Sequence, residues 1–202
     1  AVQTTIAMTI LMSVVLSICG VLLTPALLRM MKTPEDVIAH SSEYLRIYFA
    51  GLSGLLLYNM GAGILRAVGD TRRPLYFLIF SAVTNTVLDL LFVTVFHMGV
   101  AGVAIATILA QFASAVLVMV VLTRSTSDYR IVWRGMRLNK KMFGSICRLG
   151  FPAAVQLAVT SFSNIFVQSY INRFGADCMA GWTSHNKIDS FVLLPIMTIS
   201  LA

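Results

Sequence analysis

Residues 44–96 contain two long apolar stretches on either side of one basic turn: YLRIYFAGLSGLLLYNMGAGIL (44–65), RAVGDTRRP (66–74) and LYFLIFSAVTNTVLDLLFVTVF (75–96). An α-helix needs about 20 mostly apolar residues to cross the hydrocarbon core of a bilayer, and both stretches reach that length. Gly69 and Pro74 interrupt the helical pattern between them. The sequence therefore predicts two membrane-spanning helices joined by a short basic loop.

Four further apolar stretches continue this pattern on both sides of residues 44–96. They are Thr4–Leu28, Val100–Leu122, Leu149–Ile171 and Cys178–Ala202. The last is the weakest, because its first half carries His185, Lys187 and Asp189. We therefore predict an all-α membrane protein, a polytopic helical bundle with six transmembrane helices.

The composition excludes an ordinary soluble domain. Hydrophobic residues make up 58% of the chain and charged residues 11%, whereas soluble domains carry about 25% charged residues. The chain opens with Ala1 inside an apolar run, with no signal-peptide pattern before it. We therefore expect it to be a truncated piece of a larger protein.

The distribution of charge predicts the orientation in the membrane. The loops at 66–73 and 124–148 hold three and seven Lys or Arg residues, ten together, whereas the loops on the opposite side hold four. The positive-inside rule places the ten-cation side in the cytoplasm. Because the cations of this chain, with net charge +7, lie between apolar spans, we expect a membrane protein and no nucleic-acid partner.

The sequence offers no enzyme site. It contains no nucleophile–base constellation, no phosphate-binding loop and no cluster of metal ligands. Its three cysteines are far apart and lack CxxC spacing, so they indicate neither a disulfide framework nor a metal site; they are Cys19, Cys147 and Cys178. We expect neither an enzyme nor an organic cofactor.

Asp89 is the strongest candidate for a functional side chain. It lies inside an otherwise apolar span, where a charged side chain costs about 2.5 kcal/mol or more. Asn85 and Ser81 precede it at intervals of four, so the three share one face of a helix. A carboxylate beside an amide can hold a proton or a small hard cation such as Na⁺. A structural polar stripe that bonds to neighbouring helices is the alternative.

Polar residues in the last two spans are candidates to line a substrate cavity. Gln156, Asn164 and Gln168 share a slowly drifting stripe, and His185 and Asp189 are neighbours at i, i+4. Hydrogen bonds between helices are the alternative for the three amides, and an interfacial position is the alternative for His185. In the span 100–122, Thr107, Gln111 and Ser114 share one face, and small residues at 102, 106 and 110 predict close helix packing.

Three motifs that follow one another along the chain resemble those of the MATE (multidrug and toxic compound extrusion) transporter family. They are LRAVGDTRRPL (65–75), NTVLDLLFV (85–93) and GVAGVAIATILAQ (99–111), and their spacing also resembles that of the family. The resemblance implies helices three to eight of a twelve-helix, two-lobe transporter. Residues 1–123 would be the last four helices of the N-terminal lobe, 124–148 a cytoplasmic linker between lobes, and 149–202 the first two helices of the C-terminal lobe.

The resemblance also implies a function. Family members are multidrug efflux antiporters that export organic, often cationic compounds in exchange for H⁺ or Na⁺, so no cofactor beyond the coupling ion is expected. Asn85 and Asp89 match a family cation site that also uses an Asp from the first helix, outside this chain. The expected partners are the lipid bilayer of the bacterial inner membrane, small organic substrates and the missing helices of the full-length chain.

Two other functions stay open on the sequence alone. A lipid-linked oligosaccharide flippase of a related fold would need several cations in its cavity, whereas the charges deep within the predicted spans are Asp89, Asp189 and Lys187. A non-transporting membrane scaffold would have little reason to keep an acid in the bilayer.

Overall fold

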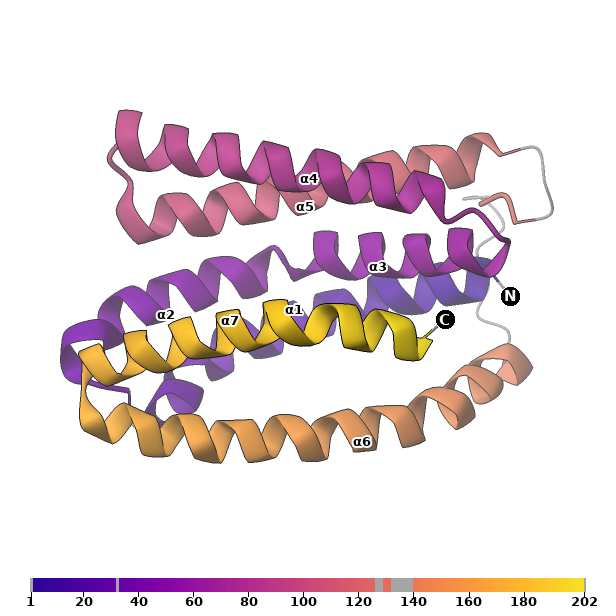
Figure 1. Ribbon diagram of the computed structural model, residues 1–202. Helices are drawn as coiled ribbons and strands as arrows, with labels where there is room; N and C mark the ends of the chain where they lie inside the picture. The colour runs from indigo at the N-terminus through magenta and orange to yellow at the C-terminus, as the bar shows by residue number, and fades with distance from the viewer. Residues whose placement is uncertain (1, 32, 126–128, 132–139, 202) are drawn as a thin grey trace. The chain divides into compact units, whose positions relative to one another are not determined.

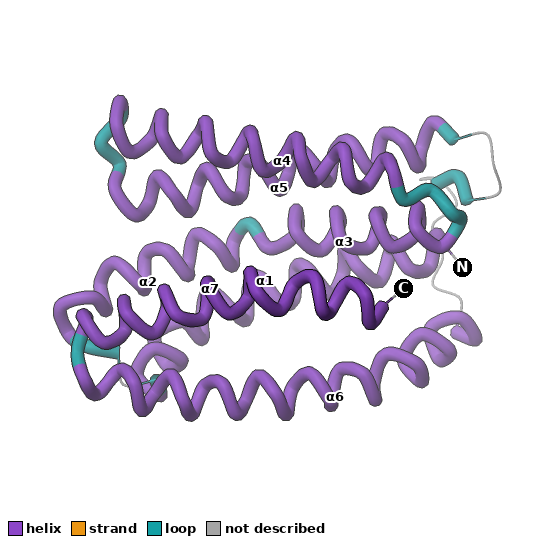
Figure 2. The backbone as a smooth tube through the Cα atoms, viewed as in Figure 1, coloured by secondary structure: helices purple, strands orange, loops and turns teal. Residues whose placement is uncertain are grey.

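The computed structural model describes residues 2–31, 33–125, 129–131 and 140–201, and these are helical with short connections and no strand (Figures 1 and 2). The α-helices are α1 (Val2–Met30), α2 (Glu35–Ala50), α3 (Leu52–Ala67), α4 (Arg72–Leu90), α5 (Gly99–Arg124), α6 (Lys140–Ile171) and α7 (Ala176–Leu201). A π-helical turn, η1 (Leu91–Val95), follows α4, and a 3₁₀ turn, η3 (Asn172–Phe174), follows α6. The predicted all-α class is confirmed.

The chain forms two compact units. The first unit comprises Ala1–Thr24 and His40–Ala153, and the second comprises Pro25–Ala39 and Ala154–Ala202. The predicted division into 1–123, 124–148 and 149–202 remains a prediction, because positions 126–128 and 132–139 of the linker lie outside the described residues. The described Ile131 is buried and packs with Val118 and Leu122.

Among the described residues, four helices are long and apolar enough to cross a membrane, and the count is five if a bent pair of helices forms one span. The four are Val2–Met30, Arg72–Val95, Gly99–Arg124 and Lys140–Phe174. The segment predicted as a sixth span forms α7, which does not pass this test over its described residues, so its crossing remains a prediction. The first helical turns of α6 precede the predicted start at 149, because hydropathy marks where a helix becomes apolar and not where it begins.

The stretch 44–65 is not one straight helix. The pair α2 and α3 bends by 48° at Gly51. A Cβ built on Gly51 would lie 2.3 Å from Cγ1 of Ile108 in α5, so the backbone approaches that side chain more closely than any other residue type allows. The segment predicted as one span is thus a bent pair of helices, and Gly51, where the bend lies, contacts a helix distant in the sequence.

Hydrogen bonds fix the basic turn between α3 and α4. Gly69 has φ of +87°, a value that favours glycine, and its N–H donates to the carbonyl of Arg66 at 3.0 Å. The N–H of Asp70 donates to the carbonyl of Leu65 at 2.9 Å, which completes a Schellman motif. The Asp70 carboxylate then accepts the Arg73 N–H at 3.1 Å and so caps α4.

Helix α5 is the centre of the first unit, with α3 and α4 packed against it (Figure 1). The predicted small-residue stripe is buried: Gly102 has no room for a side chain, and Ala106 and Ala110 are 0% and 1% exposed. On the facing side of α3, Gly54 and Gly61 lie directly against α5. Small residues thus bring the backbones close enough for extensive van der Waals contact, which drives helix association where lipid supplies no hydrophobic force.

Candidate functional site

The predicted polar stripe of α4 faces α5. The Ser81 hydroxyl donates to the carbonyl of Ala110 at 3.1 Å. One turn further along, the Asn85 amide donates to the hydroxyl oxygen of Thr107 at 3.4 Å, and that hydroxyl donates to the carbonyl of Val103 at 2.9 Å. The first two residues of the stripe therefore link the two helices, as a structural stripe would.

Asp89 differs from the other two residues of the stripe. Its Oδ1 atom is buried and has no hydrogen-bond partner among the described residues. The phenol of Tyr44 in α2 lies within electrostatic range of the Asp89 carboxylate. A buried polar atom without a partner costs about 1–3 kcal/mol, and more when it is charged. Oδ1 of Asp89 is therefore free, among the described residues, to take a proton, a cation or a hydrogen-bond donor.

Thr107 was not predicted as a partner of Asn85. A signal was present in the sequence, because α4 and α5 form a hairpin with a tight turn at His97–Gly99. In such a hairpin, residues at equal distances from the turn lie opposite each other. Phe96 is the midpoint between positions 85 and 107, so the pairing follows once the turn is fixed.

A π-helical turn directly follows the turn that carries Asp89. The Phe96 N–H donates to the carbonyl of Leu91 at 3.2 Å, and the Met98 N–H donates to the carbonyl of Phe92 at 2.9 Å. These bonds reach back further than the i−4 carbonyl of an α-helix. Short π segments within α-helices frequently occur at functional sites.

The oxygen atoms at this position suit a proton or a small hard cation. They are the carboxylate of Asp89, the amide oxygen of Asn85 and the hydroxyl of Thr107, which are all oxygen donors of the kind that hard cations prefer. Only one of the three is acidic. Neither here nor elsewhere in the described residues is a group of three or more His, Cys, Asp or Glu side chains placed to hold a metal ion.

The residues predicted to line a substrate cavity lie in the second unit, whereas Asp89 and Asn85 lie in the first. His185 Nδ1 and Asp189 Oδ1 are 3.6 Å apart and both side chains are more than half exposed. Gln156 and Asn164 are exposed on α6. The role of these residues in a cavity remains a prediction.

Gln168 has a structural contact that the sequence did not reveal. Its amide Nε2 donates to Oδ1 of Asn172 at 2.8 Å. The Asn172 amide in turn donates to the backbone carbonyl of Met31 at 2.7 Å, and Asn172 is 4% exposed. Asn172 thus ties the C-terminal end of α1 to α6 within the second unit, and one N–H of the Gln168 amide serves this tie.

We predict that Asn172→Leu destabilises the protein by about 1–3 kcal/mol, because it leaves the part-buried Met31 carbonyl and Gln168 amide without this partner. Unfolding of the purified protein in mixed micelles measures the change. Asn164→Leu on the exposed face of α6 is the matched control and should shift the midpoint by less than about 0.5 kcal/mol. Equal midpoints for the two variants would show that the Asn172 contacts do not hold α1.

Comparisons with known proteins identify the family to which this chain is related. Residues 1–91 match the family described as MatE. The chain is 33% identical over 208 residues to the "Probable multidrug resistance protein YoeA" of Bacillus subtilis (strain 168), with 100% of this chain and 45% of that protein covered. It is 29% identical over 175 residues to the "Probable multidrug resistance protein NorM" of Thermotoga maritima, with coverage of 83% and 37%.

The fold also matches a solved structure described as the inward-facing conformation of a multidrug resistance MATE family transporter of the MOP superfamily. The TM-score is 0.86 at 25% identity, and the match covers 95% of this chain and 44% of the other. The chain therefore spans less than half the length of the relatives that it matches. These relatives are transporters rather than enzymes. The sequence matches and the fold both point to the same family, and the chain belongs to the MATE family of transporters.

Proposed function

We propose that the protein containing this chain is a secondary active multidrug exporter of the bacterial inner membrane. It exports organic, often cationic compounds in exchange for inward H⁺ or Na⁺. The observation that carries the proposal is the buried Oδ1 of Asp89, which has no hydrogen-bond partner among the described residues. The names of the relatives, as multidrug resistance proteins, support the class of substrate.

In this mechanism Asp89 binds the coupling ion. A carboxylate in the membrane interior is costly when it is charged and alone, so a proton or Na⁺ stabilises the conformations in which that ion is bound. An ion shifts a conformational equilibrium only through its different affinity for the two states. The Asn85–Thr107 hydrogen bond holds the amide against α5, so that the amide oxygen has a defined position beside the ion.

Charge within the predicted spans supports cationic substrates. Away from the ends of the spans, the charged residues are two acids, Asp89 and Asp189, and one cation, Lys187. A flippase for an anionic substrate would need the opposite balance. Substrate and coupling ion would then be attracted by the same sign of charge, which is what an exchange of one cation for another requires.

Transport by the full-length protein in proteoliposomes tests this proposal. A fluorescent organic cation should move against its gradient when a proton or Na⁺ gradient is imposed, and movement should stop when a matching ionophore removes that gradient. The substrate gradient should form without ATP. Export that needs ATP, or that continues unchanged when both ion gradients are removed, would contradict the antiport mechanism.

A further inference from the structure

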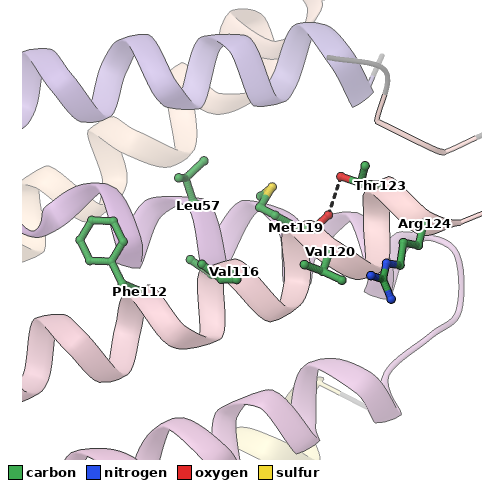
Figure 3. Close-up of a pocket in the computed structure, with 8 residues that line it drawn as sticks. Leu57, Phe112, Val116, Met119, Val120, Thr123 and Arg124 are labelled. Carbon is green, nitrogen blue, oxygen red and sulfur yellow. Dashed lines mark hydrogen bonds between the residues drawn. The ribbon is translucent and has the colours of Figure 1, made fainter. Parts of the chain in front are cut away.

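A groove between α3 and α5 has the features of a binding site for a phospholipid. Its volume is about 430 Å³, and it lies entirely within the first unit. One residue of α3 and seven of α5 line it, and apolar side chains dominate: Leu57, Phe112, Ala115, Val116, Met119, Val120, Thr123 and Arg124. Figure 3 shows these side chains in a row, with Phe112 at one end and Arg124 at the other.

The length of the groove matches one leaflet of a bilayer. From Phe112 to Arg124 along α5, a rise of 1.5 Å per residue gives roughly 18 Å. Half of a hydrocarbon core about 30 Å thick is about 15 Å. Arg124 is the last residue of α5, so the groove runs from the middle of the span to the membrane surface.

The groove wall is open to a ligand in the membrane. Val116 and Val120 are 57% and 41% exposed, whereas Ala115, which forms the floor, is 2% exposed. The polar group of Thr123 is turned back to its own helix, where its hydroxyl donates to the carbonyl of Met119 at 2.7 Å (Figure 3). The interior of the groove therefore offers van der Waals contacts to an apolar chain and needs no hydrogen bond from that chain.

Positive charge gathers at the end of the groove. Arg124 is exposed and has no acidic partner among the described residues. Arg66 lies in the last turn of α3, and α3 runs parallel to α5, so Arg66 lies at the same end of the helix pair as Arg124. Arg72 and Arg73 follow at the start of α4, at this same end. Of these four, Arg73 is neutralised by Asp70 at 3.3 Å. The end of the groove thus presents arginines that suit a phosphate.

We propose that this groove binds an anionic phospholipid of the cytoplasmic leaflet, with one acyl chain along α5 and the phosphate at Arg124. The charge asymmetry of the loops places this end in the cytoplasm, where anionic lipids are found and where basic pockets between helices bind head groups. The apolar row and the terminal arginine together match a lipid, which has an acyl chain and a phosphate in that order. A neighbouring helix of the full-length protein is the competing occupant, and the variants below distinguish it from a lipid.

Native mass spectrometry of the full-length protein tests the site. Purified protein is mixed with phosphatidylglycerol or with phosphatidylcholine of the same chain length, and retained lipid is measured. Wild-type protein should retain phosphatidylglycerol preferentially, and Arg124→Gln should reduce that affinity about fivefold. The control Arg46→Gln removes the same charge from α2, a helix that does not line the groove, and should retain most of the affinity.

A second variant tests the apolar part of the groove. Val116→Trp fills the groove from its exposed wall and should reduce retention of both lipids, whereas Val83→Trp on the exposed face of α4 should reduce neither. Equal phosphatidylglycerol retention by wild-type protein, Arg124→Gln and Val116→Trp would overturn the proposal. Unfolding caused by Val116→Trp, with unchanged lipid binding in Arg124→Gln, would also overturn it and would indicate that another helix occupies the groove.

Discussion

Asp89→Asn in the full-length protein is expected to insert into the membrane and fold, and to lose ion-driven export. An amide has nearly the same shape as a carboxylate but carries no charge and cannot take up or release a proton. Because Oδ1 of Asp89 has no partner among the described residues, the substitution breaks no hydrogen bond that is seen in the structure. Export driven by an imposed gradient should fall at least tenfold, as measured with a fluorescent cation in proteoliposomes.

Two comparisons make the Asp89 prediction specific. Asp177→Asn, in the exposed first turn of α7, removes the same charge and should leave export unchanged. Asn85→Ala should weaken coupling less than Asp89→Asn, since the amide positions the ion but carries no charge. Thermal stability of Asp89→Asn should stay the same or rise, because a neutral side chain costs less to bury. Wild-type export with unchanged ion dependence in Asp89→Asn would show that Asp89 is structural.

Gly61→Ala is expected to destabilise the protein by about 1–3 kcal/mol, the usual cost of adding volume to a tightly packed contact. Gly61 lies where α3 packs against α5, and a Cβ at this position would be 2.1 Å from Cγ1 of Val118. Val118 is 0% exposed and part of the core with Leu65 and Leu122, so it has no space into which it can move. The two helices must separate to accept even one methyl group.

Gly63→Ala is the matched control for Gly61→Ala. Gly63 lies in the same helix, and a Cβ there meets no atom within 4 Å. Alanine is favoured over glycine within a helix by up to about 1 kcal/mol, so this variant should be as stable as wild type or more stable. Unfolding in mixed micelles measures both variants. If both shift the midpoint equally, the close contact of α3 with α5 does not limit stability.

The spans around Asp89 were predictable from local sequence. Hydropathy located α4 with η1 and α5 to within a few residues, because the apolar runs end at charged or turn residues on both sides. The i, i+4 spacing also placed Asn85 and Ser81 on one face with Asp89. Such features depend only on neighbouring residues and on the thickness of the bilayer.

Other features depend on tertiary contacts and could not be predicted from the sequence. The bend at Gly51 arises where Ile108 of α5 meets the backbone. The tie from Asn172 to Met31 joins residues that are 141 positions apart. No periodicity in a single helix encodes either contact, since each requires the position of a second helix.

The candidate site was only partly predictable for the same reason. Asp89 and Asn85 were identified as unusual residues in an apolar span, whereas Thr107 was identified only as one member of a polar face. The pairing of Asn85 with Thr107 required the register of the hairpin.

Binding of the coupling ion to the purified full-length protein is the most direct test of the central claim, that Asp89 carries the ion. Calorimetric titration with Na⁺ measures Na⁺ binding, and a pH indicator measures protons released when Na⁺ or an organic cation is added. Wild-type protein should show Na⁺ binding or proton release that is absent in Asp89→Asn and present in Asp177→Asn. Identical ion binding and proton release in wild-type protein and Asp89→Asn would contradict the assignment of this site.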